Sequence, residues 1–281
     1  MRPTDRAVRI ALDIGADVGT VWRAWTETDW LCGWMVERID GAMAEGSRVK
    51  WRWDSLGLEL DLEVLVCEPE RRLVLAGGPS GRARQTQSVT LSRVAGGTRV
   101  ELEHAGFAIA PGGDDERAGT AAGWHVMLRV LAHYLAARAG RRRACAAVLT
   151  PLAAPLAAIG PLLHDARARA GWLCDAGSQG QALAREGERF ALRGPGGAPV
   201  SGHVLALAPP FQLALAWNEV DGVLILRAIQ VTPGANGPVL VGAQAWSWSP
   251  ERPAWLAARA ALETAVARLV RLAGGCASGS A

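Results

Sequence analysis

Apolar and polar residues alternate with a period of two over much of the first half of the chain. The alternation first covers residues 8–12, and a segment with helical spacing of its apolar residues follows at 17–25. From residue 48 onward the alternation returns in short segments, which glycine and proline turns separate. The apolar positions of these segments are Val49, Trp51, Trp53, Leu58, Leu60, Leu62, Val64, Leu73, Leu75, Val89, Leu91, Val100 and Leu102. The pattern predicts a strand, a short helix and then a series of antiparallel strands.

A long amphipathic helix is predicted to follow these strands. Asp114 and Asp115 come directly after a Pro-Gly-Gly turn and place negative charge where the dipole of a helix favours it. The helix is expected to end near Gly140. One face of it is apolar, with Trp124, Met127, Leu128, Leu131 and Leu135 at helical spacing.

The second half of the chain repeats this plan at an offset of about 140 residues. Matching segments occur in the same order in both halves, and a closing helix is expected at about 253–272. The matched pairs are 30–32 with 172–174, 44–49 with 185–190, 68–73 with 208–213, and 97–101 with 237–241. We therefore predict a tandem duplication.

A basic run at 141–143, followed by a stretch rich in proline and alanine, marks the boundary between the halves. We expect a first domain at 1–142, a linker at 143–152, a second domain at 153–275 and a tail at 276–281.

Composition excludes several classes of protein. The formal net charge of the 281 residues is only +3, too weak a bias to indicate a nucleic-acid partner. Residues 1–10 carry several charges and no apolar core, so they do not resemble a secretory signal, and a cytoplasmic protein is expected. The uncharged stretch 144–163 contains Pro151 and Pro155, which argues against a membrane span.

Neither the cysteines nor a search for common catalytic motifs indicates a metal site, a disulfide framework or a cofactor. The five cysteines are widely spaced and never form a CxxC pair, so no metal site and no disulfide framework are expected. Serine-nucleophile, phosphate-loop and dinucleotide motifs are absent from the sequence, and no cofactor is predicted.

Tryptophan is the unusual feature of the composition, with 12 residues against three phenylalanines. Rings in such number either fill a core or line a cavity around a ligand. Both interpretations stay open here. The candidate ligand-binding residues, which share the inward face of the first domain, are Trp34, Trp51, Trp53, Leu62, Leu75, Leu91, Leu102, Trp124, Leu128 and Leu131.

His104 is the strongest candidate for a catalytic or ligand-binding side chain, because it falls on the same inward-facing alternation as Val100 and Leu102. A histidine that faces a cavity could bind a carbonyl group or act as a general acid or base. The competing interpretation is a hydrogen-bonded histidine at the end of a strand. His125 and His133 on the long helix are read as part of a solvated polar stripe rather than a metal site.

Several motifs resemble a known family, the START-like superfamily also called SRPBCC. The branch is the one named for homology to the activator of the 90-kDa heat-shock-protein ATPase. The matching residues lie within about 8–138, and the second half looks like a degenerate copy that keeps only part of the pattern. The motifs are 21–26 with Trp34, the Glu45-Gly46 hairpin, 69–73, 96–100, 104–107 and the Gly123-Trp124 pair.

The resemblance implies an α+β fold of two helix-grip domains, each a curved antiparallel sheet wrapped around a long C-terminal helix. It also implies a cavity for a hydrophobic small molecule, used either for transport or for cyclase or dehydratase chemistry on a polyketide-like compound. The alternative it implies is a co-chaperone module that contacts a heat-shock ATPase. Fold alone does not decide among these functions.

The second domain is expected to be mainly structural. The offset places Ala245 where the first domain has His104, so a methyl group replaces the one polar group favoured for chemistry. Any pocket in the second domain would lack this polar group.

Overall fold

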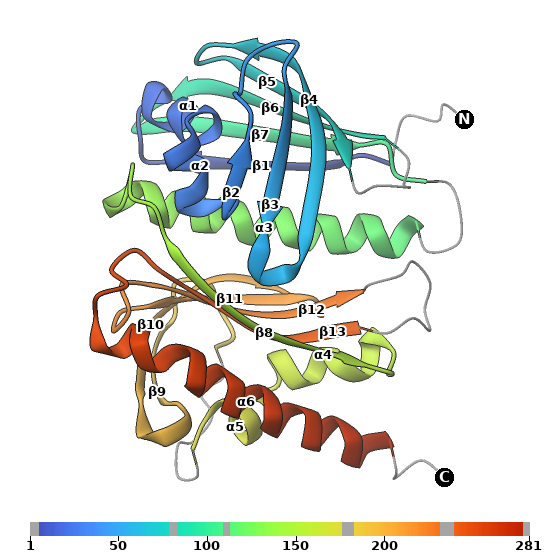
Figure 1. The fold of residues 1–281 in the computed structure, drawn as a ribbon, viewed down its shortest axis with the longest axis vertical. Helices are drawn as coiled ribbons and strands as arrows, with labels where there is room; N and C mark the ends of the chain where they lie inside the picture. Colours follow the sequence, from blue (N-terminus) through green and yellow to red (C-terminus); the bar gives the residue numbers. More distant parts are fainter. Residues whose placement is uncertain (1–5, 79–83, 109–112, 176–182, 231–238, 278–281) are drawn as a thin grey trace. The chain divides into compact units, whose positions relative to one another are not determined.

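In a computed structural model the chain divides into two compact units, residues 1–143 and 144–281. The structure describes residues 6–78, 84–108, 113–175, 183–230 and 239–277. Each unit contains one antiparallel sheet and a long C-terminal helix (Figure 1). The predicted α+β fold with tandem helix-grip domains is confirmed.

The first unit has seven strands in the order β1-β7-β6-β5-β4-β3-β2. Two short helices connect the first two strands of the chain, and α3 follows the last strand. The bounds are β1 (Val8–Ile14), α1 (Val18–Thr26), α2 (Thr28–Trp34), β2 (Arg38–Asp40), β3 (Arg48–Trp53), β4 (Leu58–Glu68), β5 (Arg72–Gly78), β6 (Gln85–Val94), β7 (Gly97–Ala105) and α3 (Gly113–Ala137).

The second unit has six strands in the order β8-β13-β12-β11-β10-β9. Its plan repeats that of the first, but the described residues contain no counterpart of the short edge strand β2. The bounds are β8 (Ala144–Leu152), α4 (Leu156–His164), α5 (Ala166–Leu173), β9 (Arg189–Arg193), β10 (Pro199–Ala208), β11 (Gln212–Trp217), β12 (Gly222–Gln230), β13 (Val239–Ser247) and α6 (Pro253–Ala277).

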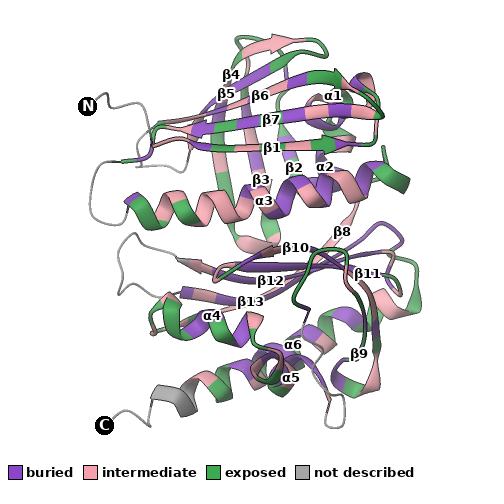
Figure 2. Ribbon diagram, turned by 180° about the vertical axis from the view of Figure 1, so that it is seen from behind, coloured by how far each residue is buried: buried purple, intermediate pink, exposed green. Residues whose placement is uncertain are grey.

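The alternation of apolar and polar residues along the strands determines which side chains form the core of the first unit. On β7, Val100, Leu102 and His104 are buried, whereas Glu101 and Glu103 between them are exposed. Figure 2 shows this alternation of buried and exposed positions along the strands. Because successive side chains point to opposite faces of a sheet, one face is apolar and is covered by helices.

An equivalent tryptophan joins the two short helices in each unit. In the first, the indole Nε1–H of Trp34 donates to the carbonyl oxygen of Ala24 at 2.8 Å. In the second, Trp172 donates to the carbonyl of Leu162 at 2.7 Å. Both donors lie ten residues after their acceptors, and both rings are fully buried.

The hairpin that follows is also repeated. The N–H of Gly46 donates to the carbonyl of Val64, and that of Gly187 to the carbonyl of Val204, both at 2.8 Å. A register irregularity follows each acceptor, before Val66 in the first unit and before Ala206 in the second. Shared irregularities at matched positions are typical of duplication rather than of two unrelated sheets.

The predicted linker at 143–152 was wrong. Residues Ala144–Leu152 form β8, which pairs with β13 along its whole length. β8 is at the edge of the sheet. Proline has no backbone N–H to donate, but an edge strand tolerates it where the missing donor would point away from the neighbouring strand. At the other end, α6 continues to Ala277 and so takes in the first two residues of the predicted tail. Residues 278–281 lie outside the described part.

No helix in the described part of the chain is long and apolar enough to cross a membrane. The uncharged stretch 144–163 is divided between β8 and α4.

Replacing Trp34 or Trp172 with phenylalanine should destabilise the protein. Each substitution removes an indole donor from a buried carbonyl and leaves a small cavity, so the free energy of unfolding should fall by roughly 1–3 kcal/mol. Urea denaturation of the full chain measures this.

Trp30→Phe serves as the control, since Trp30 is only partly buried and its ring stacks on the guanidinium of Arg23, 4.3 Å away. It should change stability by less than about 0.5 kcal/mol. An equal loss in all three variants would contradict the structural role of the two buried indoles.

Candidate functional site

His104 lies at the centre of a hydrogen-bonded chain inside the first unit. Its side chain, on β7, is only 6% exposed. The indole Nε1–H of Trp124 on α3 donates to the ring Nδ1 at 2.9 Å. An indole N–H can only donate, so Nδ1 must be the unprotonated nitrogen of a neutral ring. The proton of His104 is therefore on Nε2.

The chain continues from His104 to the first turn of α3. Nε2 of His104 lies 2.9 Å from Oε1 of Gln85, to which it donates. Nε2 of Gln85 in turn donates to a carboxylate oxygen of Glu116 at 3.1 Å. Helix α3 is thus bonded to the sheet at two points, through Trp124 and through Glu116.

Burial keeps His104 uncharged. Desolvation lowers the pKa of its ring from 6.5 to about 4. Protonation would also put a second N–H against the indole N–H of Trp124. In this arrangement neither ring nitrogen can exchange a proton with a substrate unless a bond is first broken.

Aromatic rings continue the cluster on both sides of His104. Its ring is 5.1 Å from that of Phe107, centroid to centroid. The ring of Trp25 on α1 is 6.0 Å from Trp124 and 4.8 Å from Trp34. The result is a continuous aromatic layer from α1 and α2 to the end of β7.

All ten residues proposed from the sequence as ligand-binding are buried in the first unit. The four tryptophans among them, however, fall into two groups. Trp34 and Trp124 meet through Trp25, while Trp51 pairs with Trp53 on β3 at a centroid distance of 6.2 Å. The indole of Trp53 donates to the carbonyl of Met35 at 2.7 Å. The sequence analysis did not single out Trp25, Gln85, Gln87 and Glu116.

Among the described side chains of the first unit that are more than nine-tenths buried, three polar atoms lack a hydrogen-bond partner. They are Nε1 of Trp25, Nε1 of Trp51 and Oε1 of Gln87. None of the three forms a hydrogen bond with any of the described residues. Gln87 pairs with His104 across β6 and β7 and shares its inward face.

The second unit replaces the polar residues of this site. In the first unit Leu75, Gln87 and His104 are aligned across β5, β6 and β7. The corresponding residues across β11, β12 and β13 are Leu215, Leu224 and Ala245. A leucine and an alanine therefore occupy the positions of the glutamine and the histidine.

Comparison with known proteins found similarity to one protein family. Residues 16–136 match the family model described as Activator of Hsp90 ATPase homolog 1-like protein. The match spans α1 to the end of α3, which is nearly all of the first sheet and its helices. The first unit is therefore similar to this family over nearly the whole of its helix-grip fold.

Solved structures similar to the chain include one that spans both helix-grip domains. DynU16, titled a putative protein in the dynemicin biosynthetic locus, is 20% identical with a TM-score of 0.45, and the match covers 96% of this chain and 99% of that one. Protein MLL2253 from Mesorhizobium loti is 26% identical over 47% of this chain and 98% of its own, with a TM-score of 0.43.

The Aha1 dimer from Colwellia psychrerythraea is 23% identical over 46% of this chain and 95% of its own, with a TM-score of 0.42. No curated protein matches the chain.

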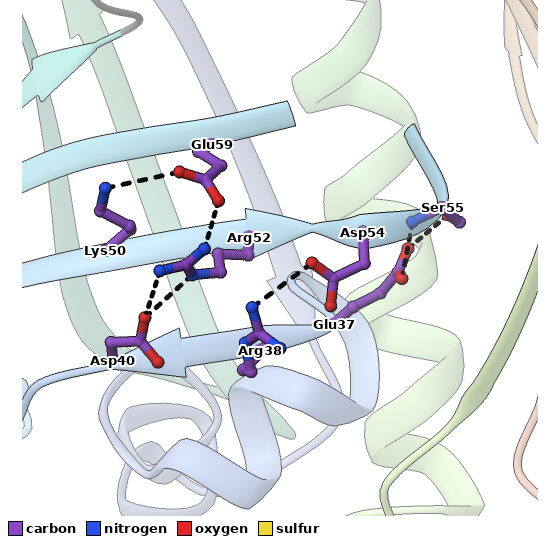
Figure 3. Close-up of polar contacts among 8 residues, drawn as sticks. All are labelled: Glu37, Arg38, Asp40, Lys50, Arg52, Asp54, Ser55 and Glu59. Carbon is purple, nitrogen blue, oxygen red and sulfur yellow. Dashed lines mark hydrogen bonds and ion pairs between the residues drawn. The ribbon is translucent and has the colours of Figure 1, made fainter. Parts of the chain in front are cut away.

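The outer face of the helix-grip sheet is charged rather than apolar. Figure 3 shows Arg52 on β3 between Asp40 on β2, at 2.8 Å, and Glu59 on β4. Asp61 and Glu59 raise the pKa of Lys50, which lies 3.3 and 3.4 Å from their carboxylates. The pair of Arg52 with Asp40 links β2 to β3 and the Lys50 pairs link β3 to β4, but exposed ion pairs of this kind contribute little stability. Figure 3 also draws the pairs Arg38 with Asp54 and Glu37 with Ser55.

Two hollows of about 480 and 570 Å³ lie on this outer face. Charged side chains on their rims are already paired, Arg84 with Glu63 at 2.6 Å and Arg9 with Glu103 at 2.8 Å. These hollows are open and have charged rims, and by the alternation of the strands they lie on the opposite side of the sheet from Trp51 and His104.

The polar stripe of α3 does not form a metal site with neighbouring groups. His125 and His133 are half buried, and each interacts with other parts of the protein. Within the described ranges, no three histidine, cysteine or carboxylate side chains come together as metal ligands would.

Acid should destabilise the protein, partly through His104. The unfolded chain binds a proton near pH 6.5 and the folded chain only near pH 4, so stability is complete above 6.5 and is lost as pH falls toward 4. The loss due to His104 should reach about 3 kcal/mol. Urea unfolding at pH 7 and at pH 4.5 measures it.

His104→Asn, whose side chain can accept from Trp124 but does not titrate, should reduce this pH dependence. Part of it should persist, because burial also lowers the pKa of His164 in the second unit to about 4. A variant with the unchanged wild-type slope would show that His104 titrates normally in the folded protein.

Proposed function

We propose that the first unit binds a small molecule between its sheet and α3. The observation that carries the proposal is the set of partnerless buried polar atoms on Trp25, Trp51 and Gln87. A buried donor or acceptor without a hydrogen-bond partner costs about 1–3 kcal/mol of folding free energy, so such groups are rare in well-packed protein cores. A bound molecule that satisfied them would recover this free energy.

The surroundings of these atoms suit a ligand that is mostly apolar. Leu75, Leu102, Leu128 and Leu131 are each no more than 2% exposed and face the same interior. Binding sites for small molecules are usually apolar cavities with a few fixed polar groups. The interior of the first unit combines apolar side chains of this kind with a few polar groups.

The second unit is proposed to be a supporting copy. Leu224 and Ala245 stand at the positions of Gln87 and His104, so the polar groups that would orient a ligand are missing from this part of its core. If the chain arose by duplication, the second copy has no counterpart of Gln87 and His104. This supports a single ligand-binding site, in the first unit.

Binding without chemistry is the reading that the geometry supports best. Both ring nitrogens of His104 are hydrogen-bonded, one to Trp124 and one to Gln85. This suits a residue that positions neighbouring side chains rather than one that transfers a proton. A cyclase or dehydratase role would require a proton donor or acceptor that can reach the substrate.

A second candidate function rests on the family match. The matched family is described by its likeness to an activator of the Hsp90 ATPase, which favours a protein partner. In that case the chain should raise the turnover of a 90-kDa heat-shock ATPase with no small molecule present.

Native mass spectrometry of the full chain, purified from its own host, tests the binding proposal. We expect an added mass that disappears when the protein is unfolded. The double variant Gln87→Leu with His104→Ala, which carries the residues of the second unit, should stay folded by circular dichroism and lose the added mass.

Wild-type protein without any added mass would contradict the proposal. Retention of the same mass by the folded double variant would place the molecule elsewhere in the chain.

A further inference from the structure

We propose that the larger hollow on the outer face of the first sheet is a second binding site, for a polyhydroxylated carboxylate such as a sugar acid. The hollow is on the other side of the sheet from the interior between the sheet and α3. Binding in the hollow therefore does not depend on binding in the interior.

The hollow lies over four neighbouring strands, β5, β6, β7 and β1, which run side by side in Figure 2. Its volume of about 570 Å³ is in the range of roughly 300–1,000 Å³ that is usual for small-molecule sites. Pairing between the strands arranges the outward side chains in two rows. The first row is Arg72, Thr90, Glu101 and Ala11. The second row is Val74, Ser88, Glu103 and Arg9.

Neighbouring residues in such rows have their Cβ atoms about 4.5–5.5 Å apart. The short side chains of the two rows form the floor of the hollow, and the long charged side chains form its rim. The rim residues are Arg9, Arg72, Glu101 and Glu103. These charged groups surround a ligand that lies on the floor.

Three of the four rim charges are already compensated. Arg9 and Glu103 pair with each other at 2.8 Å. Glu101 pairs with Arg99 at 3.6 Å. The two carboxylates can still accept hydrogen bonds from a ligand, because each has two oxygens and about four lone-pair sites.

Arg72 is the exception on this rim. It is exposed, and it forms no ion pair with any of the described residues. The acidic residue directly opposite it on β4, Glu68, pairs with Arg71 instead. The hollow thus presents one uncompensated positive charge, on a guanidinium whose planar fork fits a carboxylate through two parallel hydrogen bonds.

A row of hydroxyl groups lies beside Arg72 on the floor of the hollow. Thr86, Ser88 and Thr90 occupy alternate positions of β6 and share its outward face. Their hydroxyls form no hydrogen bond within the described part of the chain. Because a hydroxyl both donates and accepts, this row matches a ligand that carries several hydroxyls of its own.

Glu101 and Glu103 limit the charge of the ligand. A phosphate group carries a charge of about −1.5 to −2 at neutral pH, and the two carboxylates would repel it. A carboxylate carries a single negative charge, which Arg72 alone compensates. Ligand hydroxyls, in contrast, donate to the two glutamates. The arrangement therefore favours a molecule with one carboxylate at one end and hydroxyls along the rest.

The corresponding face of the second unit has a different chemistry. Val223, Ile225 and Arg227 of β12 occupy the positions of the three hydroxyl residues. Gln212, at the position of Arg72, accepts a hydrogen bond from Arg227 at 3.2 Å. The hydroxyl row and the unpaired arginine are therefore features of the first unit.

A ¹H–¹⁵N NMR titration of the full chain with four ring compounds tests the proposal. The compounds are D-glucuronate, D-glucose, cyclohexanecarboxylate and D-glucose 6-phosphate. D-glucuronate should bind about fivefold more tightly than D-glucose, which lacks the carboxylate, and than cyclohexanecarboxylate, which lacks the hydroxyls. D-glucose 6-phosphate should bind more weakly than D-glucuronate. The amide signals that shift should be those of β6 and β7 around Ser88, Thr90 and Glu101.

Two variants assign these preferences to residues. Arg72→Gln should abolish the preference for D-glucuronate over D-glucose. Its control is Arg48→Gln, because Arg48 is also an exposed arginine on the outer face but lines the other hollow.

Ser88→Ala should weaken D-glucuronate about threefold to fivefold and leave cyclohexanecarboxylate unchanged. Its control is Ser92→Ala, since Ser92 is exposed on the same face of β6 and lies outside the hollow. All four variants change outward-facing side chains and should stay folded by circular dichroism.

Several results would overturn the proposal. Equal binding of D-glucuronate and D-glucose, or tighter binding of the phosphate, would refute the ligand class. An Arg72→Gln variant that keeps the preference, or an Arg48→Gln variant that loses it, would place the site elsewhere. Absence of any saturable shift on this face would refute the site itself. None of these results bears on binding in the interior.

Discussion

The hydrogen bond from the Trp124 indole to Nδ1 of His104 is the interaction on which the interior of the first unit depends. It joins α3 to β7 at a length of 2.9 Å, and it fixes His104 as a neutral ring with its proton on Nε2. That proton then binds Gln85, and Gln85 binds Glu116 at the start of α3. One donor-only group thereby sets the tautomer of His104 and, through Nε2–H, the orientation of the Gln85 amide.

Against this satisfied chain, the unsatisfied atoms of Trp25, Trp51 and Gln87 are conspicuous. The same core that gives His104 two partners leaves its cross-strand neighbour Gln87 with an open acceptor. The second unit has the same strands in the same register but fills these positions with Leu224 and Ala245. The aligned positions are therefore polar in one copy and apolar in the other.

Periodicity was sufficient to predict the fold and which of the candidate residues point inward. The inward phase of Val100 and Leu102 placed His104 correctly, and the helical spacing from Trp124 identified the buried face of α3. Gln87 occupies the same phase as Val89 and Leu91, so its inward position was visible in the sequence. Its missing partner was not, because that depends on which groups α1 and α3 bring against β6. The strand at 144–152 was missed because its alanines give weak alternation and Pro151 resembles a linker residue.

Chemical shifts of the indole N–H groups test the central claim most directly, namely that the partnerless donors are ligand contacts. In ¹⁵N-tryptophan-labelled protein, with resonances assigned by single Trp→Phe variants, adding α-tetralone, a two-ring ketone whose carbonyl can accept from an indole N–H, should shift the Nε1–H signal of Trp25 or Trp51 downfield. Those of Trp34 and Trp53, which already donate to backbone carbonyls, should move little. Unchanged signals from both Trp25 and Trp51 in the presence of a bound compound would contradict the account.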